Sequence, residues 1–298
     1  MKNSALKGGI LVALGASCYG VLTTFVKLAY QENFTPYEVT FAQLLLGYLG
    51  LVVLDFALKR GSSAKRKVKP TRKNIIQLIL AGTSLGLTSI FYYLAVQFIS
   101  VSIGIVLLMQ SVWMGVVLDA ILSKKFPTLL KSISVLIIIS GTLLATNVFF
   151  EQITLDLTGV LLGLLAAASY TVTIYTSNRV ALNLSSISRS KWMMLGGLLI
   201  VVLLTTHNLV EQFNAEIFLK WGPILALLGA VLPPILLTSG MPKINVGLGV
   251  IITAIELPVA VLMAYFILDE RVVFSQWIGI LLILLSIVVM NLRKVKKG

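Results

Sequence analysis

The chain contains little of what covalent or metal chemistry needs. It has one cysteine, Cys18, and one histidine, His207, among 298 residues. A single cysteine excludes an intramolecular disulfide and a cysteine-cluster metal site, and no glycine-rich phosphate loop occurs. Cys18 is interpreted as a small buried residue of the first apolar run, and His207 as a loop residue. We therefore expect no metal ion and no cofactor.

Charged residues are also scarce. Only 12% of the residues are charged, 58% are hydrophobic, and the mean hydropathy is +0.99. A soluble domain of this length would need far more charge to cover its surface. One transmembrane helix needs roughly 20 apolar residues, so ten helices would use about 200 and leave only short loops. The composition therefore predicts an integral membrane protein without a soluble domain.

Apolar runs separated by polar or charged breaks predict an all-α fold of ten transmembrane helices. The runs cover approximately residues 8–30, 37–58, 74–96, 100–122, 131–149, 157–180, 187–206, 219–240, 244–266 and 273–292. The third and fourth runs are nearly fused, and so are the eighth and ninth, which leaves eight longer helices as the alternative. Each fused pair is too long for one crossing, which favours two hairpins.

The basic residues are distributed asymmetrically. The chain has 24 Lys and Arg against 11 Asp and Glu, a net charge of +13. They lie in short segments between apolar runs, above all in 59–73, so we do not expect a nucleic-acid partner. With the N-terminus inside, all of them except Lys27, Lys220 and Arg271 fall on the cytoplasmic side. This predicts a multi-pass protein of the cell membrane with both termini in the cytoplasm.

The two halves of the chain correspond to each other. Gly8 and Tyr19 of the first run align with Gly159 and Tyr170 of the sixth. Two further pairs of segments align at nearly the same offset: 100–104 with 245–249, and 121–125 with 267–271. The constant order and spacing of these matches indicate an internal duplication.

The duplication predicts the architecture. Residues 1–150 would form one five-helix repeat and residues 151–298 the other. Because five is odd, the second repeat enters the membrane from the opposite side, and the repeats are inverted. Inverted repeats are typical of secondary transporters, whose substrate site lies at the repeat interface near the midplane.

Several segments are similar to those of one transporter family. The stretch 268–279, Leu-Asp-Glu-Arg-Val-Val-Phe-Ser-Gln-Trp-Ile-Gly, resembles the acidic turn and Gln-x-x-Gly opening between the last two helices of an EamA repeat. Residues 256–258, Glu-Leu-Pro, resemble the family's proline-bearing fourth helix, and 35–43, which begins with Thr-Pro and ends in Gln, resembles the opening of its second helix. From about 8 to 292 the chain therefore resembles the drug/metabolite transporter superfamily, specifically exporters with two EamA-type repeats.

The chain also departs from the family's pattern. Gln43 stands where the family often has Arg, so an anion-binding role of that Arg is absent. In the first half, Ser-Lys-Lys at 123–125 replaces the acidic turn, and Trp113 stands near the place of Pro258. The first half is the more diverged copy. The resemblance implies an exporter of metabolites, amino acids or amphiphilic compounds that works by alternating access.

Glu256 is the first candidate for the substrate pathway, because charges within the hydrocarbon layer usually face a cavity or a partner. It is the only acid near the middle of an apolar run, and Thr253 and Gly249 share its helix face. Pro258 frees a backbone carbonyl one turn earlier and permits a bend. Glu256 could take up a proton or bind a cationic group of the substrate. The alternative is a neutral structural residue.

Other polar and aromatic side chains within the runs complete the predicted pathway. They are Gln110, Ser111, Trp113, Tyr19, Tyr170, Tyr92 and Tyr93. A wet cavity would supply partners for the polar ends of Tyr and Trp, although aromatic residues also pack helices together. Aromatic walls with one acid suit an amphiphilic or zwitterionic solute. Pro233 and Pro234 interrupt the eighth run and would form, with Pro258, either a gating hinge or a static kink.

The remaining ionisable residues within the runs have structural interpretations. Lys27 and Asp119 lie near the ends of their runs, from which they can extend toward the membrane surface. Asp55 is placed to pair with Lys59 four residues later, and Glu38 suits the start of the second helix.

The expected function is secondary-active export of a small molecule, which could be coupled to protons through Glu256. The alternatives are a membrane-embedded enzyme, for which the activating residues are missing, and a receptor or scaffold, for which the loops are too short. The lipid bilayer and a small-molecule substrate are the expected partners, and the protein is a monomer or a homodimer.

Overall fold

The computed structural model describes residues 2–61, 68–99, 101–146, 156–211, 213–269 and 271–296. Parts of three predicted features lie outside these residues: 62–67 of the basic segment, 147–149 of the fifth run, and positions 100 and 270 of the repeat matches. The described residues form helices and short connections, with no strand among them. The prediction of an all-α membrane protein is confirmed.

The helices follow each other in the order of the predicted runs. They are α1 (Lys2–Gln31), α2 (Pro36–Gly61), α3 (Arg72–Phe98), α4 (Val101–Leu108), α5 (Ser111–Ser123), α6 (Leu129–Ala145), α7 (Leu157–Arg179), α8 (Ser186–Glu211), α9 (Ile217–Lys220), α10 (Gly222–Leu225), η2 (Ala226–Val231), α11 (Leu232–Gly240), η3 (Met241–Lys243), α12 (Val246–Thr253), α13 (Glu256–Leu268) and α14 (Phe274–Lys296). Within the described residues, and with α4–α5, α10–η3 and α12–α13 each counted as one span, eight spans are long and apolar enough to cross a membrane. Helices α6 and α14 are shorter apolar helices there.

Both nearly fused pairs of runs are separate helices. Between α3 and α4 the chain becomes extended at Ile99, with φ −132° and ψ 159°. Between η3 and α12 it does the same at Ile244, with φ −131° and ψ 164°. The two turns have the same backbone conformation at corresponding positions of the two halves. In contrast, α8 continues past its predicted end, so that His207 lies on this helix and not in a loop.

Two spans are broken near their middle. In the first half the break separates α4 from α5, where the N–H of Gln110 bonds to the carbonyl of Leu107 and not to that of Val106. The side-chain amide of Gln110 donates to the freed Val106 carbonyl at 2.9 Å. The carbonyl therefore keeps a partner, which a bilayer interior requires.

The second break separates α12 from α13 at the corresponding position. Here the hydroxyl of Thr253 donates to the carbonyl of Val250 at 2.9 Å. Pro258 lies in the first turn of α13, where a missing N–H costs least. The helix is interrupted about one turn before Pro258, where a bend was predicted, and the first half is interrupted in the same place without a proline.

A third irregularity precedes the paired prolines. The segment η2 is a π-helical turn, and α11 begins directly after it with Pro233 and Pro234 in its first turn. The prediction that these prolines interrupt regular hydrogen bonding is confirmed. The wider turn lets the chain continue as a helix although two N–H groups are missing.

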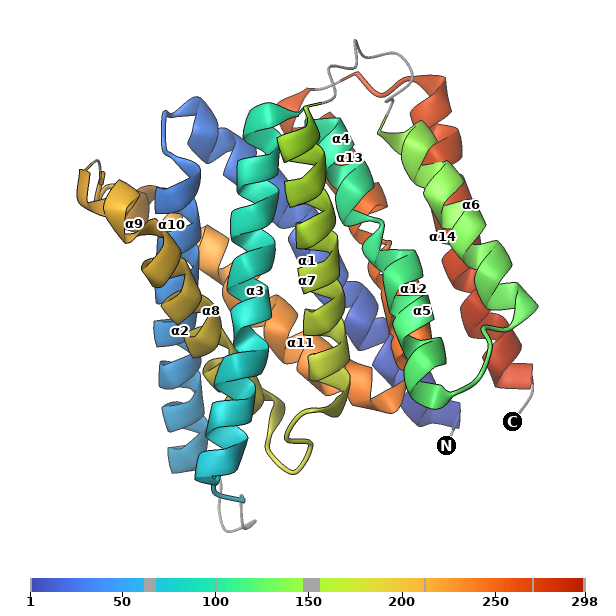
Figure 1. Ribbon diagram of the computed structural model, residues 1–298, viewed down its shortest axis with the longest axis horizontal. Coiled ribbons are helices and arrows are strands. Elements are labelled where there is room, and N and C mark those ends of the chain that lie inside the picture. The colour runs from blue at the N-terminus through green and yellow to red at the C-terminus, as the bar shows by residue number, and fades with distance from the viewer. Residues whose placement is uncertain are drawn as a thin grey trace.

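The helices pack in a symmetric pattern. Helix α3 packs on α7 and α8, while α11 and η2 pack on α1 and α2. Two contacts join equivalent helices of the two halves, α2 with α8 and α6 with α14, and a third joins the two broken spans through α5 and α12. Figure 1 shows both chain termini at the same end of the bundle, and the α6–α14 pair at one edge.

Equivalent glycines make equivalent contacts. A Cβ at Gly8 would meet the Gly240 carbonyl, Lys243 and Ile244. A Cβ at Gly159 would meet the Ala95 carbonyl, Phe98 and Ile99, which are the same three positions shifted by the repeat offset. Helix α1 therefore crosses the end of α11 as α7 crosses the end of α3.

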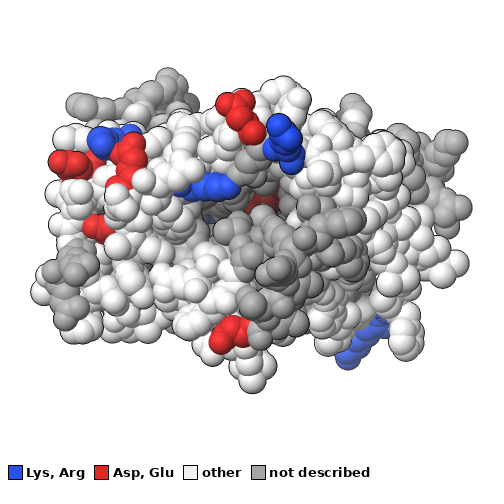
Figure 2. Space-filling view, turned by 90° about the horizontal axis from the view of Figure 1, so that it is seen from above, with Lys and Arg blue, Asp and Glu red and all other residues white. Residues whose placement is uncertain are grey.

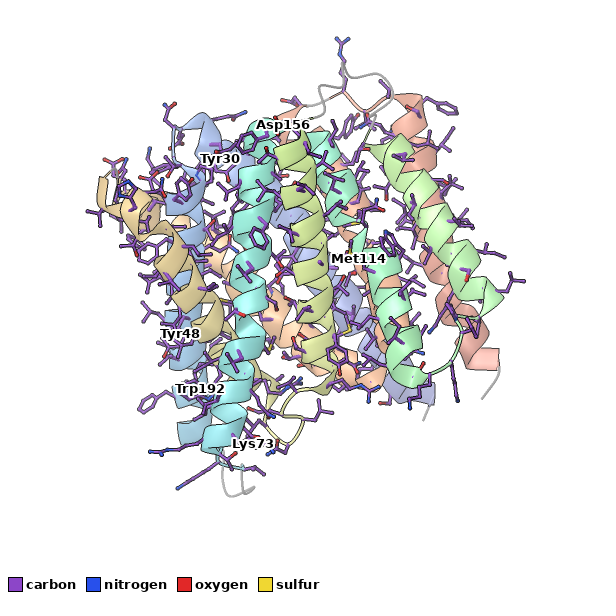
Figure 3. The ribbon with its side chains drawn as sticks, in the orientation of Figure 1. Tyr30, Tyr48, Lys73, Met114, Asp156 and Trp192 are labelled. Atoms are coloured by element: carbon purple, nitrogen blue, oxygen red, sulfur yellow. The ribbon has the colours of Figure 1, made fainter. Side chains whose placement is uncertain are left out.

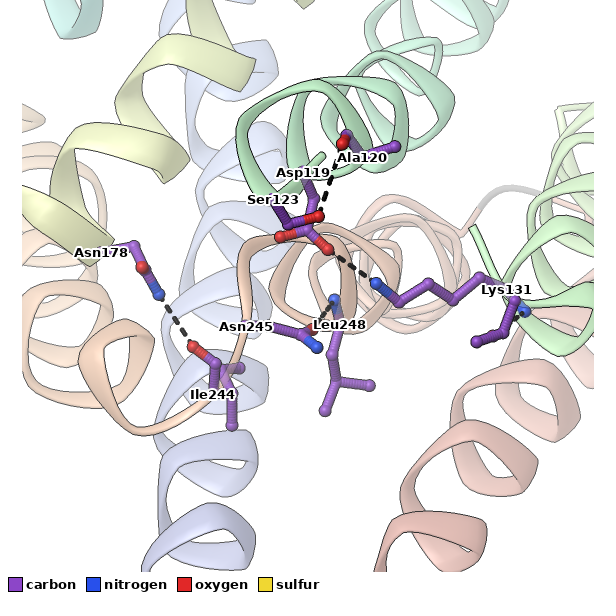
Figure 4. A network of polar contacts seen from close by, with 9 residues as sticks. Asp119, Ala120, Ser123, Lys131, Asn178, Ile244, Asn245 and Leu248 are labelled. Carbon is purple, nitrogen blue, oxygen red and sulfur yellow. Dashed lines mark hydrogen bonds and ion pairs between the residues drawn. The ribbon is translucent and has the colours of Figure 1, made fainter. Parts of the chain in front are cut away.

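Two ion pairs connect helices at the end that holds the termini. The carboxylate of Asp119 on α5 lies 2.6 Å from the Lys131 ammonium on α6 (Figure 4). Asp119 is buried, so it does not extend to the surface as predicted; the short α5–α6 connection supplies a cation instead. Asp55 pairs with Lys191 of α8. Its predicted pairing with Lys59 stays a prediction, because the Lys59 side chain is outside the described residues.

Glu38 closes the start of α2, as its position suggested. Its carboxylate accepts hydrogen bonds from the Thr35 N–H at 2.7 Å and from the Thr35 hydroxyl at 2.8 Å. The other carboxylate oxygen accepts from the Asn214 N–H at 2.6 Å. This reciprocal cap satisfies free amides at the helix start and ties α2 to the chain before α9.

Nothing in the sequence pattern singled out Arg189, which is buried in α8. Its guanidinium donates to the carbonyls of Val180, Thr238 and Ser177 at 2.9, 2.7 and 2.6 Å. These carbonyls belong to the C-terminal ends of α7 and α11, where the helix dipole favours a cation. Arg189 thus caps two helices at once.

The closest backbone approach joins α3 and α8. A Cβ at Gly82 would lie 1.8 Å from the Met193 carbonyl oxygen, and one at Gly196 would lie 1.9 Å from that of Ile79. Without a hydrophobic driving force between helices in lipid, such small-residue crossings supply the packing energy.

We expect Gly82→Ala to destabilise the protein strongly, by about 3 kcal/mol or more, because backbone must move to admit the methyl group. Thermal unfolding in detergent measures the effect. The control is Gly50→Ala on α2, where the new Cβ would meet only a methyl of Val231 at 3.3 Å. Equal unfolding temperatures for the two variants would contradict the close crossing.

Candidate functional site

One cavity of about 340 Å³ lies between the two halves. It is lined by α1, α2, α3 and α4 of the first half and by α7, η2, α13 and the start of α14 of the second. Seen from the end opposite the termini, the surface is hollowed, with acidic and basic side chains beside the hollow (Figure 2). The volume suits a small organic molecule.

Glu256 forms the acidic part of this cavity. It is the first residue of α13, directly after the helix break, and only 9% of its surface is exposed. The hydroxyl of Tyr170 on α7 donates to its carboxylate at 3.4 Å. Tyr19 on α1 meets the Tyr170 ring edge-on, with the ring centroids 6.3 Å apart. The repeat-equivalent tyrosines thus lie together next to the acid.

The position of Glu256 is set by a backbone contact. A Cβ at Gly20 on α1 would lie 2.4 Å from the Glu256 carbonyl oxygen. The glycine therefore lets α1 approach the start of α13 and holds the carboxyl at the centre of the bundle.

A second group of aromatic residues lines the wall above. The rings of Tyr92 and Tyr93 on α3 lie 5.9 Å apart, and Tyr30 of α1 packs edge-on against Tyr93 at 6.2 Å. Figure 3 places Tyr30 near the end of the bundle at which the cavity opens. These rings give the cavity an apolar surface with hydroxyl groups along it.

The entrance is basic. Lys27 of α1 and Arg271 before α14 are exposed and line the cavity. Lys27 was expected only to extend toward the membrane surface, but it also lines the cavity at its entrance. The site therefore combines a basic entrance with an acidic interior.

The structure brings together five of the sequence-predicted pathway residues: Glu256, Tyr19, Tyr170, Tyr92 and Tyr93. It places the other four, Gln110, Ser111, Trp113 and Thr253, outside the lining of this cavity.

These four residues lie at or near the two helix breaks. The indole N–H of Trp113 donates to the Gln110 side chain at 2.9 Å, on the outer face of α5. Ser111 is buried, and its carbonyl accepts from the Thr171 hydroxyl at 3.4 Å. Thr253 lies one turn before Glu256, but its hydroxyl bonds to the backbone. Sequence spacing could not distinguish these positions, because each break changes the face that the next residues present.

The three prolines lie close to the cavity. Pro258 is buried two residues after Glu256, and Pro233 and Pro234 are buried just beyond η2, whose Gly229 lines the cavity. Whether they act as hinges or as static kinks stays a prediction.

The lining residues that had no place in the predicted pathway include Gln43, Tyr30 and Lys27. Among the described residues, the buried Gln43 Oε1 and Tyr30 hydroxyl have no hydrogen-bond partner. The sequence held a signal for Gln43, since it is a lone amide within the apolar run 37–58. In the same described part of the chain, no three His, Cys, Asp or Glu side chains come together as a metal site.

Comparison with known proteins agrees with this fold. A crystal structure 18% identical in sequence superimposes with a TM-score of 0.75, over 97% of this chain and 96% of that one. No curated protein matches the chain. The model of the EamA-like transporter family matches twice, at residues 6–147 and 157–292. The chain therefore belongs to the EamA-like transporter family and is a membrane transporter of the drug/metabolite type.

Proposed function

We propose that this protein is a secondary-active exporter of a small amphiphilic or zwitterionic molecule. It crosses the cell membrane ten times, as two inverted five-helix repeats (1–150 and 151–298), and it works by alternating access. The observation that carries this proposal is the cavity of about 340 Å³ between the halves, with a buried acid directly after a helix break. Inverted-repeat carriers bind their substrates in such a place.

The repeat relation is supported by unusual backbone positions. Among the described residues, four that are not glycine have positive φ: Asn33, Lys124, Ala181 and Asp269. They form two pairs, Asn33 with Ala181 and Lys124 with Asp269, at close to the offset of the sequence matches. Corresponding turns of the two halves thus share a rare conformation.

The sidedness is supported by charge. Both termini lie at the end of the bundle that also holds Lys73, and Asp156 lies at the opposite end (Figures 1 and 3). By the positive-inside rule the termini face the cytoplasm. The cavity then opens to the outside, and the conformation is outward-open.

Alternating access is supported by an asymmetry between the broken spans. On the cytoplasmic side, α5 packs on α12, where Gly115 meets Val250. The repeat-equivalent positions, Ala260 on α13 and Ile105 on α4, line the cavity. In the opposite conformation, α4 would pack on α13, and α5 would separate from α12. This change would close the outer side of the cavity and open the cytoplasmic side. The helix breaks allow each half-span to move separately.

Proton coupling is supported by the surroundings of Glu256. It is the one acid among the described lining residues, and a carboxylate this far from water needs a proton or a cation. A proton and a cationic group of the substrate would compete for the same carboxyl. Such competition drives export when protons enter from outside.

We expect Glu256→Gln to abolish proton-driven export, because the amide cannot release a proton. In proteoliposomes with a trapped pH-sensitive dye, a panel of amino acids and amines should move protons about tenfold or more slowly than with the unchanged protein. The exposed Glu216→Gln variant is the control. Proton movement that equals that of the control would remove the coupling proposal.

Cysteine pairs test alternating access in a Cys18→Ala background. Gly115→Cys with Val250→Cys should cross-link on oxidation in the conformation described here. A Cβ at 115 would lie 3.0 Å from that of Val250, so a small shift reaches the roughly 3.5–4.5 Å of a disulfide. The link should stop transport.

The matched pair is Ile105→Cys with Ala260→Cys, at the repeat-equivalent positions. It should cross-link only when the cavity closes to the outside, and the fraction linked should rise under turnover. If this pair never links in membranes although the first pair does, the protein does not alternate.

A further inference from the structure

We propose that Gln43 is a specificity-determining residue, whose side-chain oxygen accepts a hydrogen bond from an N–H group of the substrate's cationic end. The proposal rests on the proposed function and deepens it. It assigns to the substrate a primary or secondary amine, and it rejects a fully methylated ammonium, which has no N–H.

The position of Gln43 is fixed by tight packing between α2 and η2. One turn after Gln43 on α2, a Cβ at Gly47 would lie 2.2 Å from the Ala230 Cβ. A Cβ at Gly229 would lie 2.4 Å from Gln43 Nε2 and 2.8 Å from Cδ. The π-helical turn and its glycine therefore form a slot for the amide. π-helical turns of this kind occur frequently at functional sites.

Gln43 has a hydrogen-bond acceptor to which a ligand could donate. Its side chain is 4% exposed and lines the cavity, yet Oε1 has no partner. Leaving a buried acceptor without a hydrogen-bond partner costs free energy of folding. Such an acceptor in a native structure therefore indicates a functional role.

Three hydroxyls of the cavity wall are already used, because each donates to a carbonyl of its own helix. Thr23 donates to the Gly20 carbonyl at 2.7 Å, and Thr88 donates to that of Ser84 at 2.7 Å. Ser89 donates to the Leu85 carbonyl at 3.3 Å. Gln43 Oε1 thus remains open to a donor that enters with the solvent or with the substrate.

The same cavity contains Glu256, which supplies the charge that a cation needs. The tyrosines around it offer ring faces to any cation, whether or not the cation carries an N–H. Charge and rings alone would accept amines and quaternary ammonium ions equally. Among the described lining residues, Gln43 has the one side-chain amide oxygen without a hydrogen-bond partner. This oxygen distinguishes an amine from a quaternary ammonium ion, because only the amine can donate an N–H to it.

Equilibrium binding to the purified full-length protein in detergent tests this proposal without depending on transport. The probes are 2-phenylethylamine and its N,N,N-trimethyl analogue, which share the ring and the charge. We expect the primary amine to bind about tenfold or more tightly, since a site built for a hydrogen bond rejects a ligand that lacks the donor.

Two variants locate the preference. Gln43→Met keeps the length of the side chain and should abolish the preference, while the trimethyl analogue binds as before. Gly229→Ala should act similarly, because its methyl group pushes the amide out of its slot. Glu256→Gln should weaken both probes by the same factor and leave their ratio unchanged.

A preference that persists in both folded variants, or the absence of any preference in the unchanged protein, would overturn the proposal. If neither probe binds the unchanged protein, the amine assignment is equally wrong. Failure of the exporter proposal has a different signature. In that case binding and its preference are normal, but no substrate moves across proteoliposome membranes.

Discussion

Backbone hydrogen bonding inside a bilayer is the constraint on which this structure depends. A helix that breaks within the membrane exposes carbonyls that lipid cannot satisfy. At the break before α5, the Gln110 side chain supplies the missing donor, and at the break after α12, Thr253 does the same. The breaks are therefore stable, and α13 can begin with an acid at the centre of the bundle.

The second constraint is the distance between helices. Glycines at the crossings let backbones touch, as Gly20 does with the start of α13 and Gly82 does with α8. The Gly20 contact lies at the interior end of a broken span, and the Gly82 contact joins two unbroken helices. The outer half-spans α4 and α13 border the cavity instead. In the proposed transport cycle, these two short half-helices are the parts that move.

The chemistry of the cavity follows from which polar groups are already used. Wall hydroxyls such as Thr23 and Thr88 bind their own helices, and Gln110 and Thr253 satisfy the breaks. Glu256 and Gln43 remain available to a ligand, among tyrosine rings and below a basic entrance. An acid and an unpartnered amide oxygen in one cavity fit the proposed substrate, which carries positive charge and N–H groups.

The sequence by itself determined the membrane class, the order of the helices and the internal correspondence of the halves. Hydrophobic runs, charged breaks and repeated spacing can be read directly along the chain. Because a bilayer requires apolar helices of a certain length, these patterns are enough to predict the membrane spans. The sequence also identified Glu256, because an acid in the middle of an apolar run is costly in lipid and therefore faces a cavity or a partner. It identified the family through the segments near 256 and 268.

Only the tertiary structure decided which residues share the cavity. Gln110, Ser111 and Trp113 looked equivalent to the tyrosines, but each helix break turns the next side chains to another face. Gln43 and Lys27 entered the site because α1, α2 and η2 pack together there. Asp119 was buried because α6 brought Lys131 to it. Such placements depend on helix crossings between distant segments, and hydropathy along the chain carries no information about those crossings.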